Sequence, residues 1–137
     1  MSPFVGKGTL PWDQQMTKVL VAEDNMHFRR AIVETLSGAI PDLQVEEAVS
    51  GQEALDKTEK FNPSLIIMDI RLPDASGLDL ANKIRAQHPS THIAILTSYD
   101  LPEYRQRAAE LGIVCFLVKD QATPEEILNL ATNYSQC

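Results

Sequence analysis

The chain is poor in cysteine, in tryptophan and in long apolar runs. Two of its 137 residues are cysteine and one is tryptophan. Cys115 and Cys137 lack the spacing of a metal site or a redox motif, so we expect two reduced thiols without a structural role. The longest apolar run, residues 113–118, is far too short to span a bilayer, and the amino terminus lacks the apolar core of a secretory signal. The sequence therefore predicts a cytoplasmic protein without a membrane segment.

Basic residues are also scarce. The chain has 12 lysines and arginines against 19 aspartates and glutamates, which gives a formal net charge of −7. Domains that bind nucleic acid or anionic lipid usually carry a basic face, whereas an acidic surplus repels both. We therefore expect no direct contact with nucleic acid or with a membrane. With 44% hydrophobic and 23% charged residues, the composition is typical of a globular domain with a core.

Apolar periodicity begins at residue 18. Residues 1–16 show none, so we assign them to an N-terminal extension or leader and residues 17–137 to one domain. Short apolar runs predict strands at residues 18–22, 44–48, 64–68, 92–96 and 114–118. Three of them are continuously apolar, as in parallel strands covered on both faces, and each is followed by a helical apolar stripe. The alternation predicts an α/β fold, a doubly wound five-stranded parallel sheet with helices on both faces.

Helix-end signals agree with this assignment. Ser50 with Glu53, and Thr123 with Glu126, have the spacing of capping boxes at the starts of the second and fifth helices. Gly112 follows the fourth helical stripe, where a glycine commonly ends a helix.

Polar side chains follow four of the predicted strands. Glu23 and Asp24 follow the first strand, Asp69 the third, Thr97 the fourth and Lys119 the fifth. In a doubly wound fold these positions meet at one edge of the sheet, where ligands bind. Three carboxylates there repel one another unless a cation neutralises them, and a hard divalent ion with oxygen ligands suits them. Because no histidine or cysteine lies at these strand ends, the sequence predicts Mg²⁺ rather than zinc.

The same residues suit phosphoryl transfer. A carboxylate such as Asp69 can act as a nucleophile and form an aspartyl phosphate. Mg²⁺ and Lys119 would neutralise the phosphoryl oxygens, and Thr97 would donate a hydrogen bond to one of them. Taken singly, Lys119 is typical of an exposed lysine, Thr97 of a strand end and Phe116 of a core aromatic. Only their joint spacing favours a site.

These stretches together resemble the receiver domain of two-component response regulators. The resemblance covers roughly residues 17–134 and is carried by residues 19–25, 65–73, 76–77, 95–98 and 116–119. It implies a flavodoxin-like strand order of 2-1-3-4-5 and a role for each of seven residues. These are the phosphoacceptor Asp69, the metal-binding acids Glu23 and Asp24, the backbone carbonyl of Arg71 as a further Mg²⁺ ligand, the switch hydroxyl Thr97, the phosphate-binding Lys119 and the switch aromatic Phe116.

The resemblance also implies a function and partners. A sensor histidine kinase or a histidine phosphotransfer protein would donate the phosphoryl group, and phosphorylation would favour a homodimer. The chain would be a signalling switch rather than an enzyme for free substrates.

Lys119 is followed by Asp120 where many receivers have proline, so we expect a trans peptide bond or a strained one there. This pattern is similar to receivers of helix-turn-helix transcription regulators, whose output domain would lie outside these residues. Bulky side chains at Arg71 and Tyr99 predict a long-lived phosphoryl group.

Three other functions compete with this hypothesis. An aspartate-nucleophile phosphohydrolase needs a second acid two residues after the nucleophile, where this chain has Arg71. A flavodoxin-like cofactor binder needs a hydroxyl-rich and glycine-rich loop after the first strand, where this chain has Glu23 and Asp24. A receiver that serves only as a protein-binding scaffold, without phosphorylation, remains open.

Overall fold

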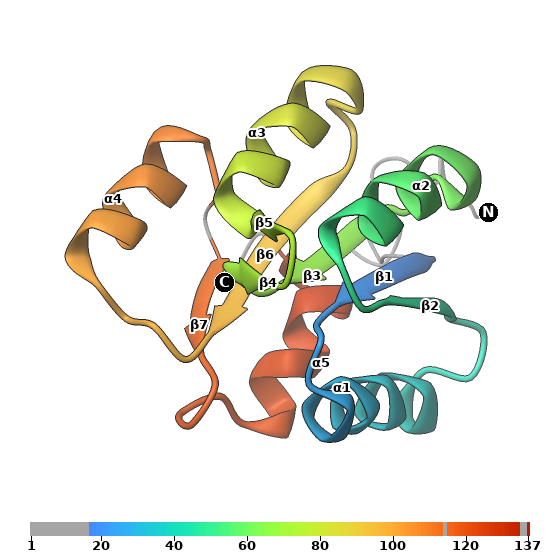
Figure 1. Cartoon of the computed structure of the whole chain (residues 1–137). Helices are drawn as coiled ribbons and strands as arrows, with labels where there is room; N and C mark the ends of the chain where they lie inside the picture. Colours follow the sequence, from blue (N-terminus) through green and yellow to red (C-terminus); the bar gives the residue numbers. More distant parts are fainter. Residues whose placement is uncertain (1–16, 114, 135–136) are drawn as a thin grey trace, which may run out of the picture.

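We describe the chain from a computed structural model, in which residues 17–113, 115–134 and 137 are described (Figure 1). The predicted extension over residues 1–16 lies outside the described residues. The elements follow one another in the order β1 (Lys18–Ala22), α1 (Met26–Ala39), β2 (Gln44–Ala48), α2 (Gly51–Phe61), β3 (Leu65–Met68), β4 (Arg71–Leu72), β5 (Ala75–Ser76), α3 (Gly77–Gln87), β6 (His92–Thr97), α4 (Pro102–Glu110), β7 (Cys115–Val118) and α5 (Pro124–Thr132).

The main sheet has five parallel strands in the order β2-β1-β3-β6-β7. Because β4 and β5 form only a small separate antiparallel ribbon, this is the predicted order 2-1-3-4-5 of the five main strands. Helices α1 and α5 cover one face of the sheet, and α2, α3 and α4 cover the other (Figure 1). The predicted fold class is confirmed. The β4–β5 ribbon was not predicted, since two-residue strands leave no periodic pattern.

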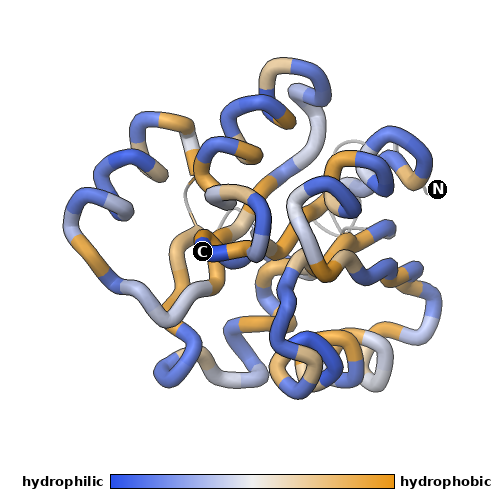
Figure 2. The backbone as a smooth tube through the Cα atoms, in the orientation of Figure 1, coloured by the Kyte–Doolittle hydropathy of each residue, from blue (hydrophilic) through white to orange (hydrophobic). Residues whose placement is uncertain are grey.

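The core lies on both faces of the sheet. All four residues of β3 are buried, with Leu65 and Ile67 on the side of α1 and α5, and Ile66 and Met68 on the opposite side. Figure 2 shows hydrophobic residues along the central strands and hydrophilic ones on the outward turns of the helices. This two-sided burial explains why β3 is a continuous apolar run rather than an alternating one. No helix among the described residues is long and apolar enough to cross a membrane.

The helix-end predictions hold with one exception. Thr123 accepts a hydrogen bond from the Glu126 amide at 3.2 Å, and its own amide donates to the Glu126 carboxylate at 3.0 Å, which completes the capping box of α5. Ser50 caps α2, but the Glu53 carboxylate accepts from the amide of Val49 rather than from that of Ser50. The reciprocal half of that box was therefore predicted wrongly. Gly112 has a φ of +78°, a conformation that glycine adopts without strain.

The two cysteines are not independent thiols, so this prediction is wrong. The structure joins Cys115 and Cys137 in a disulfide with a Cα–Cα distance of 5.4 Å. Their separation of 22 residues conceals this proximity. Each helix of a doubly wound fold returns the chain to the edge where the strands begin, so the end of α5 comes back beside the start of β7.

Candidate functional site

The three predicted acids meet at one edge of the sheet. Ala22 and Met68 are paired in the register of β1 and β3, so the residues that follow them, Glu23 and Asp69, are neighbours. Ligand atoms of Glu23, Asp24 and Asp69 all lie within 4.8 Å of one another. No other group of three acidic, histidine or cysteine side chains comes together in this way among the described residues. The register of two adjacent central strands thus builds the cluster.

Lys119 joins this cluster from the end of β7. Its ammonium group lies 3.0 Å from Oδ2 of Asp69 and also pairs closely with Oε1 of Glu23. Glu23 and Asp69 are only 2% and 6% exposed, whereas Asp24 is exposed. The ring of Phe28, from α1, lies 4.8 Å from the same ammonium group. One cation therefore contacts two buried carboxylates, and the third carboxylate faces solvent.

Burial and pairing act against each other on the pKa values at this site. Burial raises the pKa of Glu23, and its hydrogen bonds with Lys119 and the Asn25 amide only partly oppose this effect. Burial lowers the pKa of Lys119, but its hydrogen bonds with the carboxylates of Glu23 and Asp69 outweigh burial and raise it overall. The ammonium group is thus held in its charged form by the two acids it contacts.

The acid cluster fits a hard divalent cation. Carboxylate oxygens are the ligands that Mg²⁺ and Ca²⁺ prefer, and the cluster offers at least three of them without histidine or cysteine. The amide nitrogen of Arg71 lies 3.4 Å from Oδ1 of Asp69, so the backbone at residue 71 runs beside the acids. The carbonyl of Arg71 therefore belongs to a backbone segment next to the cluster. The arrangement suits Mg²⁺, which keeps several positions open for water or phosphate oxygens.

Thr97 lies on β6 and Phe116 on β7, the last two strands in the order of the sheet. Thr97 is fully buried, and its hydroxyl oxygen accepts a hydrogen bond from the Tyr99 amide at 3.3 Å. Phe116 is paired with Ile95 and packs partly buried against the core cluster on the side of α2, α3 and α4. The structure thus brings Glu23, Asp24, Asp69 and Lys119 into one cluster, while the Thr97 hydroxyl accepts from Tyr99 and the Thr97 carbonyl from the amide of Lys119.

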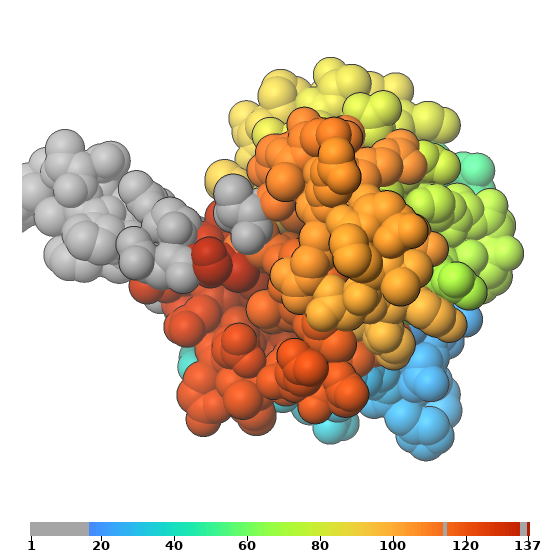
Figure 3. Space-filling view, turned by 90° about the vertical axis from the view of Figure 1, so that its left-hand side faces the viewer, coloured from blue at the N-terminus to red at the C-terminus, as the bar shows by residue number. Residues whose placement is uncertain are grey.

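Two arginines hold aromatic rings beside the loop between β6 and α4. Cζ of Arg71 lies 4.0 Å from the centre of the Tyr99 ring, and hydrogen bonds to Tyr104 and Tyr99 raise the pKa of Arg71. Cζ of Arg105 lies 4.7 Å from the centre of the Phe116 ring. Figure 3 shows α4 and the segment from β7 into α5 side by side on one face of the molecule.

The contacts of Arg105, which lies on α4, were not predicted from the sequence. Its guanidinium also pairs with Asp100, which lies in the loop that Thr97 precedes. The ring of Phe116 is therefore linked through Arg105 to the loop after β6. Five-residue spacing between Asp100 and Arg105 is the only sequence signal for this contact, and it is a weak one. The contact of the Phe28 ring with Lys119 was likewise not predicted.

Comparison with known families decides the identity. Residues 19–132 match the sequence model of the family described as the response regulator receiver domain. The chain belongs to this family. The predicted resemblance is thereby confirmed, and the receiver occupies nearly all of the described residues.

Several relatives of this receiver are transcriptional regulators. It is 36% identical to the DNA-binding transcriptional activator DevR/DosR of Mycobacterium tuberculosis over 77% of this chain and 48% of that protein. It is 32% identical to the transcriptional regulatory protein DesR of Bacillus subtilis over 83% of this chain and 56% of that protein. The receiver thus spans about half the length of the curated relatives it matches.

Solved structures support the same assignment. The chemotaxis response regulator CheY4 of Vibrio cholerae is 34% identical to this receiver and superposes with a TM-score of 0.73, over 83% of this chain and 94% of that chain. The signal receiver domain of the putative response regulator NarL from Mycobacterium tuberculosis superposes with a TM-score of 0.77 over 89% of this chain and 98% of that chain. At 24% identity, the second comparison shows the fold alone.

Proposed function

We propose that this receiver accepts a phosphoryl group on Asp69 from the phosphohistidine of a sensor kinase or of a histidine phosphotransfer protein. The observation that carries the proposal is the position of the Asp69 carboxylate, which is nearly buried, in contact with the ammonium of Lys119 and beside two further acids. Family membership supports it, because receivers of response regulators are signalling domains.

Each residue of the cluster has a task in the transfer. A carboxylate oxygen of Asp69 attacks phosphorus, the phosphorus–nitrogen bond of the donor breaks, and the electron pair leaves on the imidazole, which takes up a proton. Lys119 neutralises a phosphoryl oxygen throughout the transfer. Glu23, Asp24, Asp69 and the carbonyl of Arg71 would hold Mg²⁺. When bound, the ion supplies positive charge for the phosphoryl oxygens.

A cleft beside the cluster gives a donor room to approach. It has a volume of about 530 Å³ and lies between the start of α1 and the segments after β6 and β7. Its lining includes Asn25, His27, Phe28, Ser98 and Lys119. An imidazole ring carrying a phosphoryl group would approach Asp69 through this opening, because Lys119, which contacts the Asp69 carboxylate, lines it.

Phosphorylation would change the loop after β6. The Thr97 hydroxyl accepts a bond from the Tyr99 amide, and its own proton remains available for a phosphoryl oxygen. A phosphoryl group adds negative charge that Lys119 and Thr97 must meet, so the loop moves toward Asp69 and the Phe116 ring moves with it. We propose that this change selects a partner or a second copy of the chain in the cytoplasm. In the whole protein it would control transcription, because the relatives DevR/DosR and DesR are transcriptional regulators.

The phosphoryl group is proposed to be long-lived. The Arg71 side chain stacks on Tyr99, and the Arg71 amide nitrogen lies 3.4 Å from Oδ1 of Asp69, so the pair would limit the approach of a hydrolytic water. Arg71 also distinguishes this site from that of an aspartate-nucleophile phosphohydrolase. It lies two residues after Asp69, and its guanidinium cannot donate a proton to a leaving group as a carboxylic acid does.

The test is phosphorylation by a small phosphodonor such as phosphoramidate. We expect wild-type protein with Mg²⁺ to incorporate up to one base-labile phosphoryl group per chain, measured by intact mass. Asp69→Asn should incorporate none, and the matched variant Asp42→Asn, at an exposed position, should behave as wild type. Absence of incorporation in wild type would favour the scaffold, and repeated turnover to free phosphate without stable incorporation would favour the hydrolase.

A further inference from the structure

The disulfide lies at the edge of the sheet opposite the acid cluster. Cys115 begins β7 and is fully buried, whereas Cys137 is exposed. Cys115 pairs with Ala94, three positions before the pair of Thr97 and Val118 at the acidic edge. At about 3.3 Å per residue, the two sites are separated by roughly 10 Å along the strand. The disulfide therefore has no direct contact with the proposed phosphorylation chemistry.

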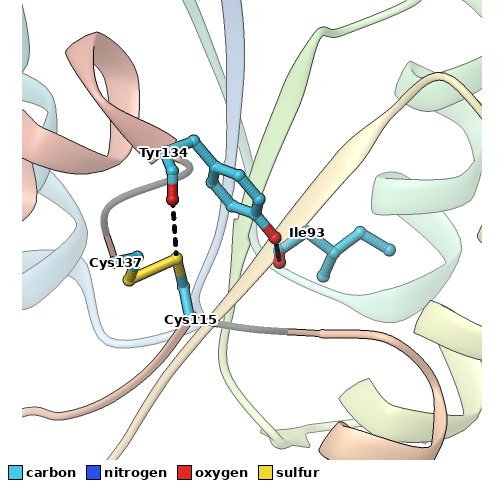
Figure 4. The surroundings of a disulfide bond; sticks show 4 residues. All are labelled: Ile93, Cys115, Tyr134 and Cys137. Atoms are coloured by element: carbon cyan, nitrogen blue, oxygen red, sulfur yellow. Dashed lines mark hydrogen bonds between the residues drawn. A yellow bond between two sulfur atoms is a disulfide. The ribbon is translucent and has the colours of Figure 1, made fainter.

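Tyr134 and Cys137, which follow α5, are attached there by two kinds of contact (Figure 4). The disulfide ties Cys137 to β7, and the Tyr134 hydroxyl donates a hydrogen bond of 2.6 Å to the carbonyl of Ile93 on β6. The Tyr134 ring lies 4.7 Å from the ring of His92. The carbonyl oxygen of Tyr134 lies 3.7 Å from Sγ of Cys115 and also accepts a bond from the Cys137 amide. The disulfide is thus covalent and can be broken by thiols, whereas the hydrogen bond and ring contact of Tyr134 are non-covalent.

We propose that Cys115 and Cys137 form a reversible redox site that anchors the end of the described chain to β7 and releases it on reduction by a dithiol. An attacking thiolate can reach the exposed Cys137, whereas it cannot reach the buried Cys115. A dithiol such as dithiothreitol would reduce the Cys115–Cys137 disulfide. A small disulfide would oxidise the two cysteines back to it.

The exchange proceeds in two balanced steps. A thiolate of the dithiol attacks Sγ of Cys137, the sulfur–sulfur bond breaks, and the electron pair leaves on Sγ of Cys115, which takes up a proton. The second thiol of the dithiol then attacks the mixed disulfide, releases the Cys137 thiol and closes into a cyclic disulfide. The dithiol loses two electrons and the protein gains two. The new thiol of Cys115 faces the carbonyl of Tyr134, so the buried sulfur keeps a polar neighbour after release.

The test counts thiols and follows the release of the segment. Protein purified without reductant is unfolded in the presence of a maleimide, which alkylates free thiols, and its intact mass is then measured. We expect a monomer with no adduct, two adducts after dithiothreitol, and one adduct under both conditions for Cys137→Ser. Hydrogen exchange at the Cys137 amide should accelerate at least tenfold on reduction of wild type. Tyr134→Phe, which keeps both cysteines, should retain the two-adduct response to reduction.

Three outcomes would overturn the proposal. Two adducts on unreduced wild type would mean that the bond does not form in solution. A mass of two linked chains would mean that it forms between molecules. Unchanged exchange at the Cys137 amide after full reduction would mean that the disulfide does not anchor the segment. None of these results depends on phosphorylation of Asp69, which is measured separately.

Discussion

Replacing Lys119 with methionine removes a cation that contacts both buried carboxylates. At 3.0 Å, and with an effective dielectric constant of about 20, the attraction between Lys119 and Asp69 is about 332/(20 × 3.0), or roughly 5.5 kcal/mol. The unfolding free energy of the variant falls by less than this attraction, because one of the buried carboxylates can take up a proton when the lysine is absent. Protonating a carboxyl with an ordinary pKa of about 4.3 at pH 7 costs about 2.7 × 1.36, or roughly 3.7 kcal/mol. Since burial already raises the pKa of Glu23, we expect a loss of about 2 to 3 kcal/mol in unfolding free energy.

The pH dependence of this loss follows from the directions of the two pKa shifts. The raised pKa of Glu23 means that its protonated form favours folding, and this contribution declines as pH rises through the folded pKa. In the variant, acid therefore relieves the repulsion. The raised pKa of Lys119 means that its contribution is complete below its unfolded pKa of about 10.4 and is lost as pH rises through the folded value. The difference between wild type and Lys119→Met should be largest from neutral pH to about pH 9.

Urea unfolding followed by far-ultraviolet circular dichroism at pH 5, 7 and 9 measures this difference. The matched control is Lys83→Met, at an exposed position on α3, which should stay within about 0.5 kcal/mol of wild type. Added Mg²⁺ should stabilise Lys119→Met more than wild type, since a bound cation supplies the missing charge. A Lys119→Met protein as stable as the control at pH 7 without Mg²⁺ would refute the electrostatic reasoning.

Three further predictions concern packing, the switch aromatic and the disulfide. Gly77→Ala would place Cβ 2.1 Å from the carbonyl oxygen of Asp69 and should lower the unfolding free energy by about 1 to 3 kcal/mol in urea, whereas Gly38→Ala, with open space around it, should not. Arg105→Ala removes a cation–π contact worth about 0.5 to 1 kcal/mol at an exposed site, so alternative positions of the Phe116 ring should gain about two- to fivefold in population by NMR. Equal populations in both proteins would contradict that contact. For a loop of 22 residues, reduction of the disulfide should lower the unfolding free energy by about 3 kcal/mol, and Cys137→Ser should show no response to reductant.

The fold and the acid cluster could be predicted because both follow from local patterns. The run at residues 65–68 is continuously apolar, so its strand had to be covered on both faces, and an acid directly after such a run had to lie at a strand end. Once the strands are parallel, Glu23 and Asp69 meet by register alone. Strand positions and the carboxylate cluster are therefore consequences of periodicity and topology.

The contacts made by long side chains could not be predicted in the same way. The stack of Arg105 on Phe116 depends on how far α4 lies from β7, and no spacing in the sequence encodes that distance. Cysteine rules failed for a related reason, because they recognise short motifs and dense frameworks, whereas Cys115 and Cys137 meet only after α5 has returned the chain across the sheet. Tertiary packing decides such contacts.

In the proposed function, the charge of the cluster would require both a cation and the hydroxyl of Thr97. Three carboxylates and the ammonium of Lys119 sum to −2 when all are ionised, which a divalent cation neutralises. A phosphoryl group on Asp69 replaces one negative charge with about two, so the same cation and lysine then leave about one negative charge unmatched. Thr97 is buried on the adjacent strand with a hydroxyl proton available. In the proposed function, moving this hydroxyl toward the added charge would also move the loop after β6, in which Tyr99 contacts Arg71 and Asp100 pairs with Arg105. The excess charge on Asp69 would thus act on the loop rather than on the rigid sheet.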